Sequence, residues 1–227
     1  MNRLLFIIAM LVGYAGIFAQ QITLEPTNFV QSLSAHHPHN VLLSPNAHFS
    51  YMENGLFEYQ ISGLSFNYES MTLTLCETRD PTPKEAEVFS ADEYPWHNKY
   101  EMKITKEQAD ALFSLFTAAV YSSNYIGSDG LQTTDGCLYR FTANRRSAKT
   151  VSPDSKTNCG RLVTVARKVC QSVKAQNASG IDALINEMAA LTDIFISYYP
   201  LEFSKHSVMY EIHKRYKVKG PSVGLKY

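Results

Sequence analysis

The stretch KITKEQADALFSLFTAAVYS, residues 103–122, decides how this chain folds, together with TDGCLYRF at residues 134–141. Thr105 and Gln108 have the spacing of a capping box, in which each side chain bonds the main chain at the start of a helix. Apolar residues then recur at the three- and four-residue intervals of one helix face. These residues are Ala109, Leu112, Phe113, Phe116, Ala119 and Val120. The sequence therefore predicts an amphipathic helix from Lys106 to Tyr121.

Strands are predicted on both sides of this helix. Apolar and polar residues alternate at 64–68, 71–76 and 100–104 before the helix, and 137–142 after it also reads as a strand. In the clearest case, Tyr100, Met102 and Ile104 face inward, whereas Glu101 and Lys103 face outward. We interpret residues 144–158 as a polar, basic loop.

Two further helices are predicted near the end of the domain. One spans Gly160–Lys174, and the other spans Ser179–Ser197 with Ser179 as its N-cap. The predicted order is several strands, the first helix, one more strand and two closing helices. This order indicates an α+β fold. We expect a mostly antiparallel sheet of about four to five strands, with about three helices packed on one face.

The first 19 residues have the form of a secretory signal peptide. A basic Asn2-Arg3 precedes an apolar run, Leu4–Val12, of roughly nine residues, which is too short to span a membrane. Small Ala19 provides a cleavage site before Gln20, although Ile17 is bulkier than the small residue preferred there. The chain is therefore predicted to be exported, either to the periplasm or out of the cell.

The remaining chain divides into three segments. We expect an irregular N-terminal extension at 20–55, the α+β domain at 56–200 and a basic C-terminal tail at 201–227. No stretch after the signal peptide reaches the roughly 18 apolar residues of a spanning helix, so no integral membrane segment is predicted.

Charge and motif content exclude several classes of partner. Lys and Arg number 21, as do Asp and Glu, so no net charge favours nucleic acid or an anionic lipid surface. No cofactor-binding loop and no G-x-S-x-G nucleophile motif occurs. No cofactor is therefore predicted.

Four cysteines in an exported chain permit two disulfides in three pairings. Cys159 and Cys170 would lie about 16 Å apart along the predicted helix, because each helical residue rises about 1.5 Å. A disulfide needs Cα atoms within about 7 Å, which excludes that pair. The sequence favours a single Cys137–Cys159 bridge, or no bridge.

Histidines form the main candidate metal site. His36, His37 and His39 are clustered, with His48 nine residues further on, and imidazole is a common ligand for zinc and copper. Because no HExxH helix or cysteine partner accompanies these histidines, a solvated loop is the favoured interpretation of the cluster, with a metal site as the alternative.

Charged loop residues form a candidate partner surface. Arg145, Arg146 and Lys149 form a basic group that could bind an acidic partner, although a solvated loop is the favoured interpretation. Asp129 and Asp135 each precede a glycine, and they are typical of turns rather than of a calcium loop.

The helix at 106–121 followed by DGCLYRF at 135–141 resembles uncharacterised exported proteins of Bacteroidetes. In that family a helix rich in Leu, Phe and Ala precedes a D-G-x-x-Y-x-F strand. The resemblance implies an exported α+β domain and provides no catalytic residue. Cys137 departs from the family pattern, in which a small or hydroxyl residue is usual.

Three hypotheses for function follow. The leading one is a non-enzymatic exported protein that binds another protein, for example an immunity-type protein that neutralises a toxin in the periplasm. The second is a hydrolase of unfamiliar type that uses the loop from Asp129 to Asp135 and His97. The third is metal binding by the cluster at His36.

Overall fold

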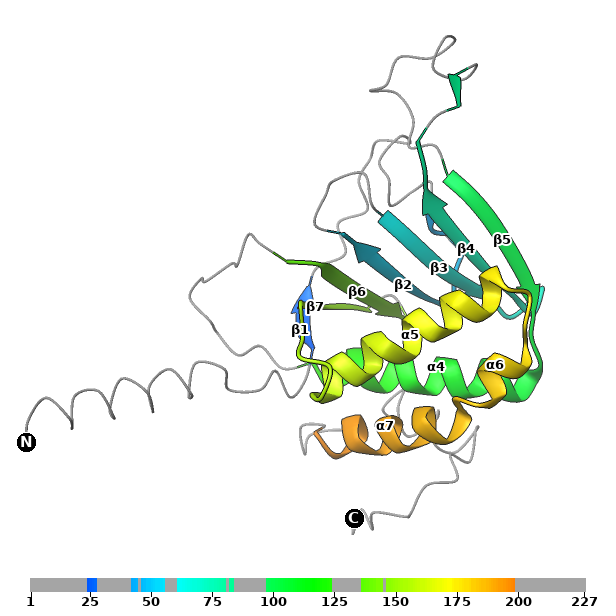
Figure 1. Cartoon of the computed structure of the whole chain (residues 1–227). Helices are drawn as coiled ribbons and strands as arrows, with labels where there is room; N and C mark the ends of the chain where they lie inside the picture. The colour runs from blue at the N-terminus through cyan, green and yellow to red at the C-terminus, as the bar shows by residue number, and fades with distance from the viewer. Residues whose placement is uncertain are drawn as a thin grey trace, which may run out of the picture.

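A computed structural model of the chain contains one antiparallel sheet with helices against one face (Figure 1). The strand order is β1-β7-β6-β2-β3-β4-β5, and every neighbouring pair is antiparallel. This confirms the predicted α+β class and the antiparallel sheet. The residues that the structure describes are 24–27, 42–44, 46–55, 61–80, 82–83, 97–123, 136–144 and 146–198.

The sheet has seven strands in this described part of the chain, rather than four to five. The strands are β1 (Glu25–Thr27), β2 (Phe49–Asn54), β3 (Ile61–Asn67), β4 (Thr72–Thr78), β5 (His97–Lys103), β6 (Leu138–Ala143) and β7 (Arg146–Val151). The helices are α4 (Lys106–Tyr121), α5 (Asn158–Lys174), α6 (Ser179–Asp182) and α7 (Ile185–Ser197).

Three of these strands correct the expectations from sequence. The irregular extension expected at 20–55 contains β1, which pairs with β7 at one margin of the sheet, and β2, which lies between β6 and β3 in its middle. Residues 49–52 are all buried, and a strand that is buried on both faces shows no hydrophobic alternation. The loop expected at 144–158 is wrong for β7. Its fully buried residues, Ala148 and Thr150, are small or polar and so give no hydrophobic alternation.

Helix α4 is the central element, and its predicted bounds are confirmed. The capping box is also present: Gln108 N–H donates to Thr105 Oγ1 at 3.2 Å, and Thr105 N–H donates to Gln108 Oε1 at 3.0 Å. One side of α4 packs on β2, β6 and β7, and another side packs on α7. Leu115 and Ala118, which lie outside the predicted apolar face, are therefore also fully buried.

Phe116 connects α4 to the middle of the sheet. Its ring meets Phe49 of β2 at 4.9 Å and Phe141 of β6 at 5.3 Å between centroids, both edge to face. Phe49 in turn stacks on Phe66 of β3 at 5.0 Å. Edge-to-face contacts of this kind add to the stabilisation from burial. Three strands and one helix therefore share a single aromatic cluster.

The remaining helices cover α4 and the far half of the sheet. Helix α5 confirms the prediction for 160–174 and packs on β4 and β5. The helix predicted at 179–197 is divided, because a turn at 183–184 separates α6 from α7. Ser179 is not an N-cap: Ala178 occupies that position without a side-chain bond. In the described ranges, no helix combines the length and apolar character needed to cross a bilayer.

Gln108 also joins α4 to α6. Its side chain is only 1% exposed, and its Nε2 donates to Ala178 O at 3.0 Å and to Asp182 Oδ1 at 2.7 Å. The Gln108 amide therefore closes the capping box and also hydrogen-bonds Ala178, which lies 70 residues later in the chain.

We expect Gln108→Ala to lower the free energy of unfolding by roughly 1–3 kcal/mol, because it removes the hydrogen bonds that this buried side chain makes with Thr105, Ala178 and Asp182. Thr105→Ala is the matched control and removes only the cap hydroxyl, at a cost of about 1 kcal/mol. Urea unfolding followed by circular dichroism measures both. Equal losses in the two variants would show that the bonds to α6 contribute nothing.

Candidate functional site

A polar hollow lies on the face of the sheet opposite the helices. Leu73 and Leu75 of β4 are fully buried towards the helices, so Thr72 and Thr74 between them face the other side. The hollow has a volume of ≈ 780 Å³, and its walls come from β3, β4, β5 and the segment at 42–44. We call it the outer hollow. It is lined among others by Ser65, Asn67, Thr72, Thr74, Lys99 and Glu101.

The floor of the outer hollow carries two parallel rows of polar side chains. On β4 the row is Thr72, Thr74 and Cys76, and these residues pair with Lys103, Glu101 and Lys99 of β5. Hydroxyl and thiol groups therefore lie beside a row of alternating charge.

The charged row on β5 is held in place. Lys99 Nζ lies 2.7 Å from Glu101 Oε1 on the same strand, and Lys103 Nζ donates to Ser70 O at 2.5 Å. Burial raises the pKa of the Cys76 thiol above its ordinary value, although Lys99 acts in the opposite direction. At neutral pH the thiol is therefore protonated and is not an activated nucleophile.

A glycine allows one wall of the hollow to form. A Cβ on Gly63 of β3 would lie 2.8 Å from Leu42 O and 2.9 Å from Leu43 Cδ2. Real Cβ atoms essentially never come so close, so only glycine permits this approach. The segment at 42–44 therefore lies directly against the outer face of the sheet.

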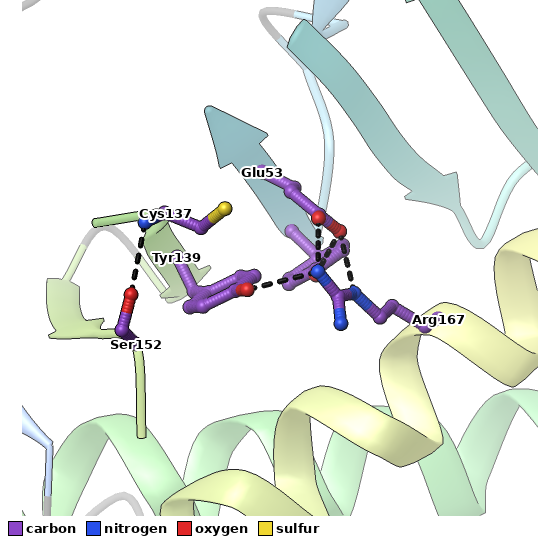
Figure 2. Close-up of polar contacts among 6 residues, drawn as sticks. Glu53, Cys137, Tyr139, Ser152 and Arg167 are labelled. Atoms are coloured by element: carbon purple, nitrogen blue, oxygen red, sulfur yellow. Dashed lines mark hydrogen bonds and ion pairs between the residues drawn. The ribbon is translucent and has the colours of Figure 1, made fainter. Parts of the chain in front are cut away.

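A second polar site lies between α5 and the sheet (Figure 2). Arg167 reaches from α5 to Glu53 on β2, where its Nε donates to Oε2 at 3.0 Å and its Nη2 donates to Oε1. Nη2 also donates to Tyr139 OH at 2.8 Å, and Tyr51 OH donates to Glu53 Oε2 at 2.9 Å. We call these four residues the arginine cluster.

The electrostatics of the arginine cluster indicate a structural role. Hydrogen bonding to Glu53 raises the pKa of Arg167 still further above its already high value. Burial, reinforced by Glu53, raises the pKa of Tyr51 well above 10.0. Burial and a hydrogen bond with the Cys137 thiol raise the pKa of Tyr139 to about 12. General acids and bases work best with a pKa near the working pH, so these phenols are poorly suited to proton transfer.

The residues of the predicted metal site are only partly described. His36, His37 and His39 lie outside the described residues. The Nδ1 of His48 accepts the Tyr68 N–H at 3.3 Å, and the His48 ring meets the Tyr68 ring edge to face. One nitrogen of His48 therefore has a structural partner. Within the described ranges, no group of three or more His, Cys, Asp or Glu residues could hold a metal ion.

The predicted charged surface is not brought together where the structure describes it. Asp129, Asp135 and Arg145 lie outside the described residues. Arg146 and Lys149 are three positions apart on β7 and therefore face opposite sides of the sheet. The guanidinium of Arg146 lies 4.4 Å from the centre of the Tyr121 ring of α4, on the helix side.

The predicted Cys137–Cys159 bridge is not formed. All four cysteines are free thiols, and Cys159 is fully buried at the start of α5. Burial raises the pKa of Cys159 to about 12. Cys137 instead precedes β6, where its N–H donates to Ser152 Oγ at 3.0 Å (Figure 2).

Sequence reasoning missed the arginine cluster and the segment at 42–44. A signal for the cluster was present on α5, where Arg167 and Lys174 are seven residues apart and share one face. Lys174 Nζ donates to Glu77 Oε2 of β4 at 2.6 Å, so both cations bond carboxylates of the sheet. Their partners were hidden because Glu53 lay in the supposed irregular extension.

His97, the histidine of the hydrolase hypothesis, lines the outer hollow. Its proposed partners, Asp129 and Asp135, are outside the described residues, so that hypothesis stays a prediction. The chain matches no family model, no curated protein and no solved structure. The resemblance to exported Bacteroidetes proteins also stays a prediction, and function is inferred here from geometry.

We expect a double-mutant cycle of Arg167→Ala and Glu53→Ala to give a coupling of about 1 kcal/mol, at the upper end for partly exposed pairs. The bidentate geometry and the 20% exposure of the Glu53 side chain support that value. Arg161 and Glu187, at 2.9 Å with side chains 33% and 41% exposed, form the control pair.

The control pair lacks the two flanking tyrosines, so its coupling should be smaller. Each cycle compares the wild type, the two single variants and the double variant. Chemical unfolding of these four proteins gives the coupling free energy of each pair. A larger coupling for the control pair would contradict the structural role of the arginine cluster.

Proposed function

We propose that this chain is an exported protein that acts by binding another protein through the outer hollow. The observation that carries the proposal is the pair of polar rows on β4 and β5, which faces away from the helices. Apart from the buried Cys76, neither row contributes to the core, because the core residues of these strands face the other side.

The chemistry of the hollow suits a protein surface better than a small apolar ligand. Small-molecule pockets are mostly apolar and enclose their ligand. The outer hollow instead presents hydroxyls, an amide and charges of both signs. Such groups give specificity by hydrogen bonding and by charge complementarity with a polar partner surface.

The charges also narrow the partner's chemistry. Lys99 and Glu101 are paired with each other and are each about half exposed, and Lys103 follows them in the row, so one carboxylate lies between two cations. A partner with acidic and basic side chains in alternation would complement the row. A uniformly anionic polymer would be repelled by Glu101 at the centre of the row.

We expect Thr74→Arg to abolish capture of the partner, because an arginine at the centre of the β4 row fills the hollow. Thr164→Arg is the matched control, since Thr164 is exposed on α5 on the other side of the sheet. The measurement is quantitative affinity purification with the tagged chain from the extracytoplasmic fraction of its own organism. Thermal unfolding should show that both variants are folded.

The proposal predicts a stoichiometric partner with the wild-type chain and with Thr164→Arg, and at least about a tenfold loss with Thr74→Arg. Recovery of the same partner by all three chains would show that binding occurs elsewhere. Failure of the wild-type chain to recover any partner would contradict protein binding as the function.

Export is proposed from the apolar run at 4–12 and the cleavage site after Ala19. We expect the exported chain to begin at Gln20, as measured by intact mass. Ile8→Arg should block export, because it places a charge inside the apolar run. Ile17→Ala should be processed at least as fast as the wild type, because it supplies the small residue preferred near the cleavage site. An uncleaved chain in the cytoplasm would contradict export.

A further inference from the structure

Strand β5 forms one margin of the sheet (Figure 1). Its ladder with β4 is complete, and no other described strand pairs with its far edge. Ile104 N–H donates to Met71 O at 3.1 Å, so the main chain of Ile104 points towards β4. Because this direction alternates along a strand, Lys99 and Glu101 direct their N–H and C=O groups to the open edge. An edge of this kind is a template for one more strand.

The charges on β5 are self-complementary. Lys99 and Glu101 face the same side of the sheet, with side chains 56% and 54% exposed. If β5 pairs antiparallel with another β5 about Tyr100, Lys99 of each chain lies opposite Glu101 of the other. If the pairing is centred on Glu101 instead, the two Glu101 side chains oppose each other, and Lys99 faces Lys103. Directly opposed like charges are destabilising, so charge selects the register centred on Tyr100.

Main-chain geometry fits the same register. Lys99 and Glu101 are the residues whose polar groups face the edge, so each pair of them exchanges two hydrogen bonds. Tyr100 then meets Tyr100 of the second copy as a non-hydrogen-bonded pair, with Cα atoms about 4.5 Å apart. The Tyr100 ring lies on the helix side, where Lys174 Nζ is 5.6 Å from its centroid. The two rings would therefore add an aromatic cross-strand contact.

We propose that a second copy of this chain binds at β5, and that the two β5 strands pair antiparallel about a two-fold axis through Tyr100. A two-fold interface uses the same surface on both copies, so assembly stops at the dimer. This proposal goes beyond the proposed function and is based on the open edge rather than on the outer hollow. Because β5 also lines the hollow, dimerisation brings the two hollows together across the axis.

Charge exchange tests the register. Mass measurement by light scattering over a concentration series should give a dimer for the wild-type chain. Lys99→Glu and Glu101→Lys should each weaken self-association by about tenfold or more, because each opposes like charges twice across the axis. Lys168→Glu is the control: it makes the same charge change at an exposed position of α5 and should leave the dimer intact.

Two combinations should restore association. A chain that carries both Lys99→Glu and Glu101→Lys should dimerise like the wild type. An equal mixture of the two single variants should form a mixed dimer, because position 99 of each strand then lies opposite an unlike charge at position 101 of the other. A wild-type chain that is monomeric at every concentration would overturn the proposal. So would single variants that dimerise as strongly as the wild type.

A covalent trap tests the axis itself. Tyr100→Cys should give a disulfide-linked dimer under mild oxidation, because Cα atoms about 4.5 Å apart lie within the range for a disulfide. The wild-type chain, with its four native thiols, is the control and should stay unlinked. A Tyr100→Cys chain that dimerises in solution without crosslinking would overturn the pairing about Tyr100.

Discussion

The burial of α4 on more than one side is the constraint on which the rest of the structure depends. The sheet covers one side of the helix and α7 covers another, so nearly every residue from Gln108 to Tyr121 is buried. An unpaired polar group in this position would be costly, and the capping box with its bonds to α6 removes that cost at the start of the helix. The aromatic cluster around Phe116 then sets how α4 lies across β2, β3 and β6.

The two faces of the sheet carry different kinds of side chain. The helix side carries the core and the arginine cluster, where Arg167 and the phenols of Tyr51 and Tyr139 bond across α5, β2 and β6. The guanidinium and both phenols keep their protons at neutral pH and are hydrogen-bonded within the cluster, which makes the cluster a structural connection. The outer side carries the hydroxyl and charged rows, whose groups face away from the core. We therefore place the proposed protein-binding function on the outer side.

The outer hollow and the β5 edge are linked through one strand. Lys99 and Glu101 contribute their side chains to the hollow and their main-chain groups to the open edge. A dimer through β5 would thus place a combined surface with two hollows on one side of a continuous sheet. At the opposite margin, β1 spans three residues in the described part of the chain, and so short an edge strand limits further growth in that direction.

Sequence by itself determined the elements whose patterns are local. The capping box and apolar spacing of α4, the inward and outward residues of β5, and the extent of α5 follow from helical and strand periodicity alone. The sequence did not determine β2, because that strand is buried on both faces and shows no alternation. Nor did it determine β7, because the fully buried residues of that strand, Ala148 and Thr150, are small or polar. Nor could it pair Glu53 with Arg167, or place Leu42 against Gly63, because these contacts join segments far apart in the chain. Only the tertiary structure decided which polar residues share a site, since the register of the sheet brings them together and no local pattern encodes that register.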